Sequence, residues 1–97
     1  MSRRAVRWTR RALGRVEQIG DHIAADDPGA ADRLVARLFA AVEALADQPA
    51  LGRPGRISGT RELVLAVAPN NVAYRVTATT VDILTVLHGA QRWPDGL

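Results

Sequence analysis

The 97-residue chain contains no cysteine and no lysine. Without cysteine, a disulfide framework and a thiolate zinc site are both excluded, and two histidines are too few for a histidine-rich metal site. No apolar run approaches the length of a membrane span, and no hydrophobic segment follows the basic N-terminus as in a signal peptide. We therefore expect one domain over residues 1–97, with no metal or cofactor, that works in the cytoplasm away from membranes.

All 13 basic residues are arginines, and they are unevenly distributed. Residues 1–15 hold six arginines and no acidic residue, whereas residues 16–50 hold seven acidic residues and two arginines. Residues 51–97 hold five arginines and three acidic residues. Basic ends indicate an anionic partner, either nucleic acid or an acidic protein surface, although a solvated surface with a high pI explains the same composition.

The first half of the sequence predicts two helices that fold back on each other. Thr9 offers an N-cap, and apolar residues then recur at helical spacing to about residue 25. Asp27 and Pro28 begin a second helix, because aspartate caps a helix and proline fits its first turn. Its apolar stripe, in which we expect Leu34, Leu38 and Val42 to face a sheet, continues to near Asp47. The short break between the helices predicts a helical hairpin.

The second half of the sequence predicts strands. Residues 49–59 are punctuated by glycine and proline and predict a loop. Apolar runs joined by tight turns then predict strands at 63–67, 72–76 and 81–87 and turns at 69–71 and 77–80. With a first strand within residues 3–8, the order predicts an α+β fold, in which an N-terminal strand and a helical hairpin precede a three-stranded antiparallel meander.

The predicted strands are apolar on both of their faces. Leu63 and Leu65 alternate with Val64, and Ile83 alternates with Leu84. One helical hairpin covers only one face of a sheet, so the other face should keep exposed apolar area. Such area marks a binding surface.

This order of elements resembles the RelE/ParE superfamily of toxins from bacterial type II toxin–antitoxin systems. The resemblance covers nearly the whole chain and is carried by four segments, which are Gly52–Arg56, Gly59–Leu63, Val72–Val76 with its tyrosine–arginine pair, and Ile83–Trp93 with its leucine–histidine sequence. It implies a small cognate antitoxin that folds on the toxin, and contact with operator DNA only through that antitoxin. The residues expected to bind the antitoxin are Leu13, Val64, Ala66, Leu84 and Val86.

The resemblance leaves two targets open. RelE-like members cleave mRNA in the ribosomal A site, whereas ParE-like members inhibit DNA gyrase and have no known hydrolytic site. Metal-free RNA cleavage needs an acid, a base and cations around the phosphate. In this chain the side chains available for that chemistry are Arg61, Glu62, Arg75 and His88. However, Asn71 and Val72 stand where RelE-type ribonucleases carry a basic residue, and the tail lacks their C-terminal histidine or tyrosine.

We therefore favour a ParE-like gyrase inhibitor without a catalytic site. The alternatives are a ribosome-dependent mRNA endoribonuclease and a weakly toxic co-repressor of its own operon. The residues expected to contact the target are Arg56, Arg61, Arg75, His88, Arg92 and Trp93. Each also has an ordinary structural explanation. Arg61 and Glu62 are adjacent in a strand, so their side chains should face opposite sides of the sheet. Arg61 can then form an ion pair with the acidic helices. Tyr74 is expected in the core with its hydroxyl at an edge.

Overall fold

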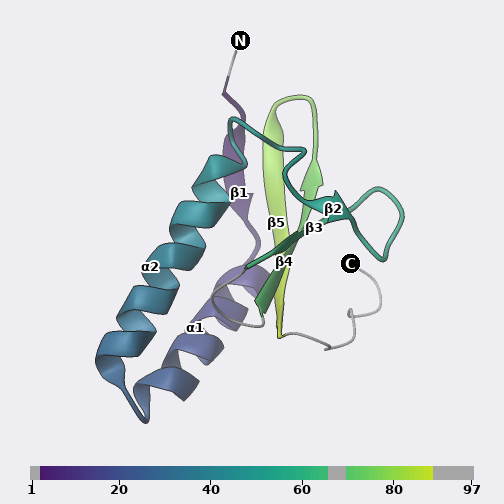
Figure 1. Ribbon diagram of the computed structural model, residues 1–97. Coiled ribbons are helices and arrows are strands. Elements are labelled where there is room, and N and C mark those ends of the chain that lie inside the picture. The colour runs from purple at the N-terminus through teal and green to yellow at the C-terminus, as the bar shows by residue number, and fades with distance from the viewer. Residues whose placement is uncertain (1–2, 66–69, 89–97) are drawn as a thin grey trace.

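A computed structural model of the protein describes residues 3–65 and 70–88 (Figure 1). Its elements are β1 (Ala5–Trp8), α1 (Arg10–Ala24), α2 (Pro28–Ala44), β2 (Arg53–Pro54), β3 (Arg61–Val64), β4 (Asn70–Val76) and β5 (Thr80–His88). The strands form one sheet in the order β1-β5-β4-β3-β2. Both helices lie together on one side of this sheet (Figure 1). The expected α+β class is confirmed.

Both helices begin at the caps that the sequence predicts. The Thr9 side chain accepts a hydrogen bond from the Ala12 N–H at 3.1 Å, and Asp27 Oδ1 accepts one from the Ala30 N–H at 3.1 Å. Each bond satisfies one of the backbone donors that a helix leaves unpaired at its start. The second helix ends at Ala44, three residues before the predicted end.

The three antiparallel strands of the expected meander are present, but their bounds differ in detail and the sheet is larger than predicted. Strand β1 pairs in parallel with β5, so the first strand forms the edge of the sheet opposite β2. Arg53, predicted to lie in a loop, pairs with Glu62 in the two-residue strand β2. Asn70 and Asn71 begin β4, so the prediction that they form a turn is wrong. Strand β3 begins at Arg61, two residues before the predicted start. The predicted site residue Ala66 lies outside the described residues.

A β-bulge in β5 decides which side chains face the helices. Tyr74 lies opposite Ile83 while Ala73 lies opposite Thr85, so Leu84 is an extra residue in β5. An extra residue shifts the alternation of a strand by one position. Val86 therefore faces the helices, where it is fully buried. The expectation that Val86 lies on an open outer face is wrong.

The main core lies between the helices and the sheet. Its buried members are Ala12, Val16, Leu38, Val42, Leu45, Val72, Tyr74, Val81, Ile83 and Val86. At one edge the rings of Trp8 and Phe39 pack with centroids 4.8 Å apart. The outer side of the sheet is closed as well, since Ala73, Thr85 and Leu87 are buried there. Within the described residues, no helix is long and apolar enough to cross a lipid bilayer.

Candidate functional site

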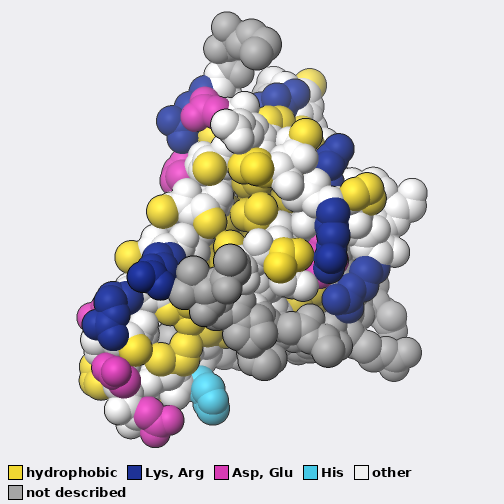
Figure 2. All heavy atoms as spheres, viewed as in Figure 1, with side chains coloured by type: hydrophobic (Ala, Val, Ile, Leu, Met, Phe, Trp, Pro, Cys, Tyr) yellow, Lys and Arg dark blue, Asp and Glu magenta, His cyan; other side chains and the backbone are white. Residues whose placement is uncertain are grey.

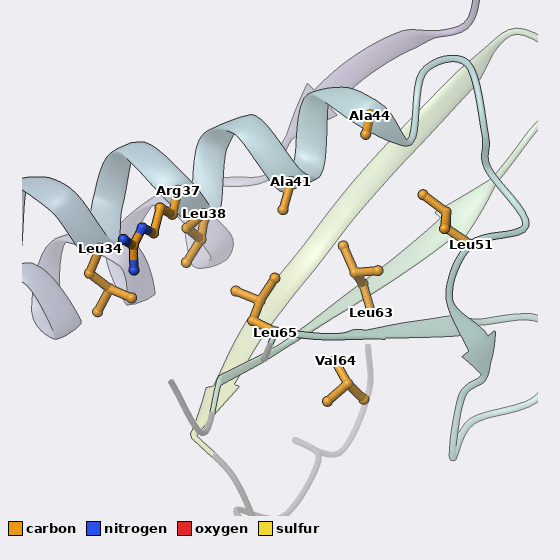
Figure 3. A pocket seen from close by; sticks show the side chains of 9 residues that line it. All are labelled: Leu34, Arg37, Leu38, Ala41, Ala44, Leu51, Leu63, Val64 and Leu65. Carbon is orange, nitrogen blue, oxygen red and sulfur yellow. The ribbon is translucent and has the colours of Figure 1, made fainter. Parts of the chain in front are cut away.

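An apolar groove runs between α2 and β3 (Figure 3). Its volume is about 330 Å³. The residues that line it are Leu34, Arg37, Leu38, Ala41, Ala44, Leu51, Leu63, Val64 and Leu65. In Figure 3 the side chains of Leu63 and Leu65 point toward α2 across an open gap. The hairpin thus leaves one part of the helix-facing side of the sheet uncovered.

The sequence of α2 explains why the groove stays open. Leu34, Leu38 and Ala41 follow one another at spacings of three and four residues, so they lie on one face of the helix. Leu38 is buried at its base, while the small side chains of Ala41 and Ala44 fill little of the space toward β3. Figure 2 shows hydrophobic side chains gathered in this hollow and arginine side chains on both of its flanks.

The groove differs from the antitoxin surface expected from the sequence. Of the described residues in that expected set, Val64 lines the groove. Leu13 is exposed on α1, and Leu84 is half-buried at the bulge. Sequence reasoning missed Leu51 because it falls in a segment rich in glycine and proline. The regular spacing of Leu34 and its neighbours on α2 was a usable signal, but we assigned that stripe entirely to the core.

A second feature lies on the outer side of the sheet, around the carboxylate of Glu62. Glu62 is 1% exposed, and its Oε1 accepts a hydrogen bond of 2.6 Å from Asn71 Nδ2. The Nη2 atoms of Arg56 and Arg53 lie 3.4 and 3.6 Å from the same oxygen. A buried charge is costly unless it is paired and hydrogen-bonded, and these three partners meet that need. We call Glu62, Asn71, Arg53 and Arg56 the carboxylate cluster.

The segment before β2 is fixed by Tyr74. Its hydroxyl donates to the Pro49 carbonyl at 2.7 Å and accepts from the Gly52 N–H at 2.8 Å. A Cβ atom on Gly52 would lie 2.6 Å from this hydroxyl, so a side chain does not fit there. Burial raises the pKa of Tyr74 above 10.0, against the opposing effects of the Gly52 hydrogen bond and the Arg61 charge.

Arg61 has a structural role that differs from the expected one. Its Nη1 donates to the Gly52 carbonyl at 2.7 Å. It therefore holds the segment before β2, and the expected ion pair with the acidic helices is not among its contacts in the described residues. Arg61 lies opposite Tyr74 on the helix-facing side of the sheet, whereas Glu62 lies opposite Ala73 on the outer side. Their side chains face opposite sides, as predicted.

The four conditional ribonuclease residues are spread over the sheet. Arg61 and Glu62 are separated by β3 itself, and Glu62 is enclosed within the carboxylate cluster. Arg75 is half-buried opposite Asp82. His88 ends β5, and its side chain lies outside the described part of the chain, as do Arg92 and Trp93. The roles of those three side chains stay predictions.

The described residues contain no group of three His, Cys, Asp or Glu side chains that could hold a metal ion. Two surfaces on β3 offer recognisable binding chemistry. The apolar groove can take a hydrophobic segment, and the carboxylate cluster presents two exposed guanidinium groups to an anion.

Comparison with known proteins identifies the family. The family model described as the ParE toxin of the type II toxin–antitoxin system parDE matches residues 6–93. The chain is 57% identical over 97 residues to Y4kP of Sinorhizobium fredii, a proposed toxin, with 100% of both chains covered. It is 38% identical over 84 residues to the toxin RelE2 of Caulobacter vibrioides, covering 87% of this chain and 93% of that one.

Solved structures agree with this assignment. The chromosomal ParDE system of P. aeruginosa gives a TM-score of 0.83 at 27% identity, covering 89% of this chain and 96% of that one. The RelBE2 toxin–antitoxin complex of Mycobacterium tuberculosis gives a TM-score of 0.66 at 25% identity, covering 89% and 98%. The order of elements, the sheet and these similarities lead to one conclusion: the chain belongs to the ParE toxin family of type II toxin–antitoxin systems, within the RelE/ParE superfamily.

Proposed function

We propose that the protein is a toxin that acts in the cytoplasm by inhibiting DNA gyrase, without catalysing a reaction. The observation that carries this proposal is the state of Glu62. A general base must reach the proton that it removes. The Glu62 carboxylate is buried, and Asn71 and two arginines already occupy Oε1. Its surroundings therefore give it a structural role.

The positions of the cations support the same proposal. Cleavage of RNA needs positive groups around one scissile phosphate. Arg61 is turned to the helix-facing side of the sheet and bound to the Gly52 carbonyl, while Arg75 lies on the outer side. These two guanidinium groups are therefore poorly placed to act on one phosphate together.

We also propose that the apolar groove is the docking site of the cognate antitoxin. Both similar solved structures are toxin–antitoxin systems. The groove fits an amphipathic segment whose apolar residues cover Leu34, Leu51 and Leu65. Arg37 lies at its border, so an acidic side chain on the same segment gains a charged partner. An antitoxin segment that is disordered when free would fold as it fills the groove.

One observation favours the ribonuclease alternative. The chain is 38% identical to a protein named as the toxin RelE2. In that case His88, which ends β5, would be one of the catalytic residues. The ribosome, with its bound mRNA, would then replace gyrase as the target.

A paired assay tests the proposed target. The purified chain is added to a gyrase supercoiling reaction and, at the same concentration, to ribosomes that carry mRNA. We expect loss of supercoiling and intact mRNA, because no acid–base pair is assembled among the described side chains. His88→Gln is the informative variant, since glutamine keeps the size and some of the hydrogen bonding of a target contact and should leave gyrase inhibition largely unchanged, but it cannot act as the acid or base of a ribonuclease. Ribosome-dependent cleavage that His88→Gln abolishes would move the chain to the RelE-like branch.

A further inference from the structure

The carboxylate cluster has a charge arrangement that packing alone does not require. Its two arginines converge on a single oxygen atom, Glu62 Oε1, at 3.4 and 3.6 Å. Their side chains nevertheless stay open to solvent, with Arg53 60% and Arg56 42% exposed. Because both Nη2 atoms lie close to one buried atom, the two guanidinium groups are held side by side at the surface. Among the described residues that form the carboxylate cluster, two positive charges face one negative charge.

We propose that Arg53 and Arg56, positioned by Glu62, bind a phosphodiester group of a DNA backbone. The inference deepens the proposed gyrase inhibition, on which it rests, by assigning this arginine pair to the DNA that gyrase holds. Glu62 is here a positioning residue, and the two arginines are the groups that touch the phosphate.

Guanidinium chemistry favours a phosphate as the ligand. An arginine side chain is planar and presents a fixed fork of N–H donors, which matches the paired oxygens of a phosphate. Two such forks held at one place lose little side-chain freedom when they bind, since Glu62 has already restricted them. Lysine offers no comparable fork, and this chain uses arginine throughout.

The surrounding charge favours a polyanion over an isolated acidic side chain. Within residues 48–65 the arginines are Arg53, Arg56 and Arg61, and Glu62 is the acidic residue. Seven of the ten acidic residues of the chain lie instead between Glu17 and Asp47, on the helices or next to them in sequence. The β2–β3 edge is therefore a basic region, separated along the sequence from an acidic one. A local excess of arginine of this kind is the electrostatic feature expected of a nucleic-acid-binding surface.

Binding of a labelled DNA duplex to the purified toxin, followed by fluorescence anisotropy over a salt series, tests this site. The double variant Arg53→Ala/Arg56→Ala should lower affinity at least about tenfold and reduce the slope of log affinity against log salt by about 1 to 2. Arg33→Ala/Arg37→Ala removes the same charge from α2 and is the matched control. An equal loss in both double variants, or no measurable binding by the wild-type chain at low salt, overturns the inference.

Two further variants separate geometry from charge. Arg53→Lys/Arg56→Lys keeps both charges and should still lose about fivefold or more in affinity, because the forks are gone. Glu62→Gln removes a negative charge beside the site, so charge alone predicts tighter binding. Positioning by Glu62 predicts weaker binding. Wild-type affinity in the double lysine variant would overturn the proposal even if Glu62→Gln fails to fold.

Gyrase inhibition is measured on the same proteins. If the arginine variants keep DNA binding but lose gyrase inhibition, the pair contacts an acidic protein surface, and the inference fails while the proposed function stands. If the wild-type chain does not inhibit gyrase but the arginine variants lose DNA binding as described, the proposed function fails and the phosphate site stands.

Discussion

The two sides of the sheet are both buried, but by different means. On the helix-facing side, Val72, Ile83 and Val86 pack against apolar helix residues. On the outer side, Glu62 and Asn71 are buried together with ion-paired arginines at their border. The first side is stabilised by apolar area removed from water, whereas the second is also stabilised by the pairing of specific polar atoms around Glu62.

This difference explains why the two candidate surfaces have different characters. Apolar packing tolerates partly covered residues at its border. Where α2 leaves β3 uncovered, the result is a groove whose apolar residues are only partly buried. A buried carboxylate cannot be left partly paired, so its partners are fixed in number and position. The helix-facing side therefore offers an adaptable site for a hydrophobic segment, whereas the outer side offers a rigid pair of charges. The following substitutions test this contrast, beginning with the largest expected effect.

Leu38→Ala should break the helix-facing side. Leu38 is buried at the junction of the core and the apolar groove. We expect a loss of about 2–5 kcal/mol in the free energy of unfolding, measured by urea denaturation, because the cavity adds to the lost transfer energy. Leu34→Ala is the control, since Leu34 is half-buried and should cost less. A loss below about 0.5 kcal/mol in Leu38→Ala would show that the helix face is wrongly assigned.

Asn71→Ala should destabilise the outer side of the sheet, because it removes one hydrogen bond to Glu62. Its Nδ2 donates to Glu62 Oε1 at 2.6 Å, and this bond helps to satisfy a buried charge. We expect a loss of about 1–3 kcal/mol in the free energy of unfolding. Val64→Ala, directly across the strand pair from Asn71 but exposed, should change it by less than about 0.5 kcal/mol. In a double-mutant cycle with Glu62→Gln, additive effects would count against direct coupling.

The sequence predicted those features of the fold that depend on neighbouring residues in the chain. Thr9 and Asp27 are caps whose partners lie three residues away, so both helix starts could be located. The strand around Tyr74 follows from its β-branched and aromatic residues. Asn70 and Asn71 were misassigned because asparagine favours turns in isolation. In this fold Asn71 serves Glu62, which no local pattern indicates.

The rest depends on contacts between distant residues. No glycine or proline marks the bulge at Leu84, and the Ile83 carbonyl there accepts a hydrogen bond from the Thr9 hydroxyl, 74 residues away in sequence. Alternation alone therefore placed Val86 on the wrong side of the sheet. The apolar groove was missed for a similar reason, since it exists only where α2 and β3 fail to meet. The family and the fold could be predicted from the sequence. The binding surfaces could not, because they depend on how the strands pair and on where α2 lies relative to β3.

Tyr74→Phe tests apolar packing and polar pairing within one side chain, because Tyr74 carries a buried hydroxyl on an apolar ring. Removing the hydroxyl leaves the Gly52 N–H and the Pro49 carbonyl without this partner. We expect a loss of about 1–2 kcal/mol in the free energy of unfolding near neutral pH.

The pH dependence of this variant gives an independent check. The pKa of Tyr74 is raised in the folded protein, so the folded state holds the proton more tightly than the unfolded state does. Stability from this group is complete below pH 10 and falls as the pH rises above it. Tyr74 is the single tyrosine in the chain, so the difference between wild type and Tyr74→Phe should shrink above pH 10. A constant difference across this range would contradict the raised pKa.

Leu51→Ala should have the smallest effect on stability and a clear effect on binding. Leu51 is 52% exposed in the apolar groove, so its truncation should change the free energy of unfolding by less than about 0.5 kcal/mol. In the proposed complex the antitoxin covers it. The apolar area then lost should weaken antitoxin binding about tenfold, as measured by calorimetry.

Leu13→Ala is the matched control for Leu51→Ala, because it is the same substitution at a side chain that is 45% exposed but lies on α1, outside the residues that line the groove. Alternation and helical spacing in the sequence selected Leu13 and passed over Leu51, whereas the gap between α2 and β3 selects Leu51. If antitoxin affinity falls for Leu51→Ala and not for Leu13→Ala, the antitoxin occupies the apolar groove between α2 and β3. The reverse result would place the antitoxin on α1 and leave the groove without its proposed occupant.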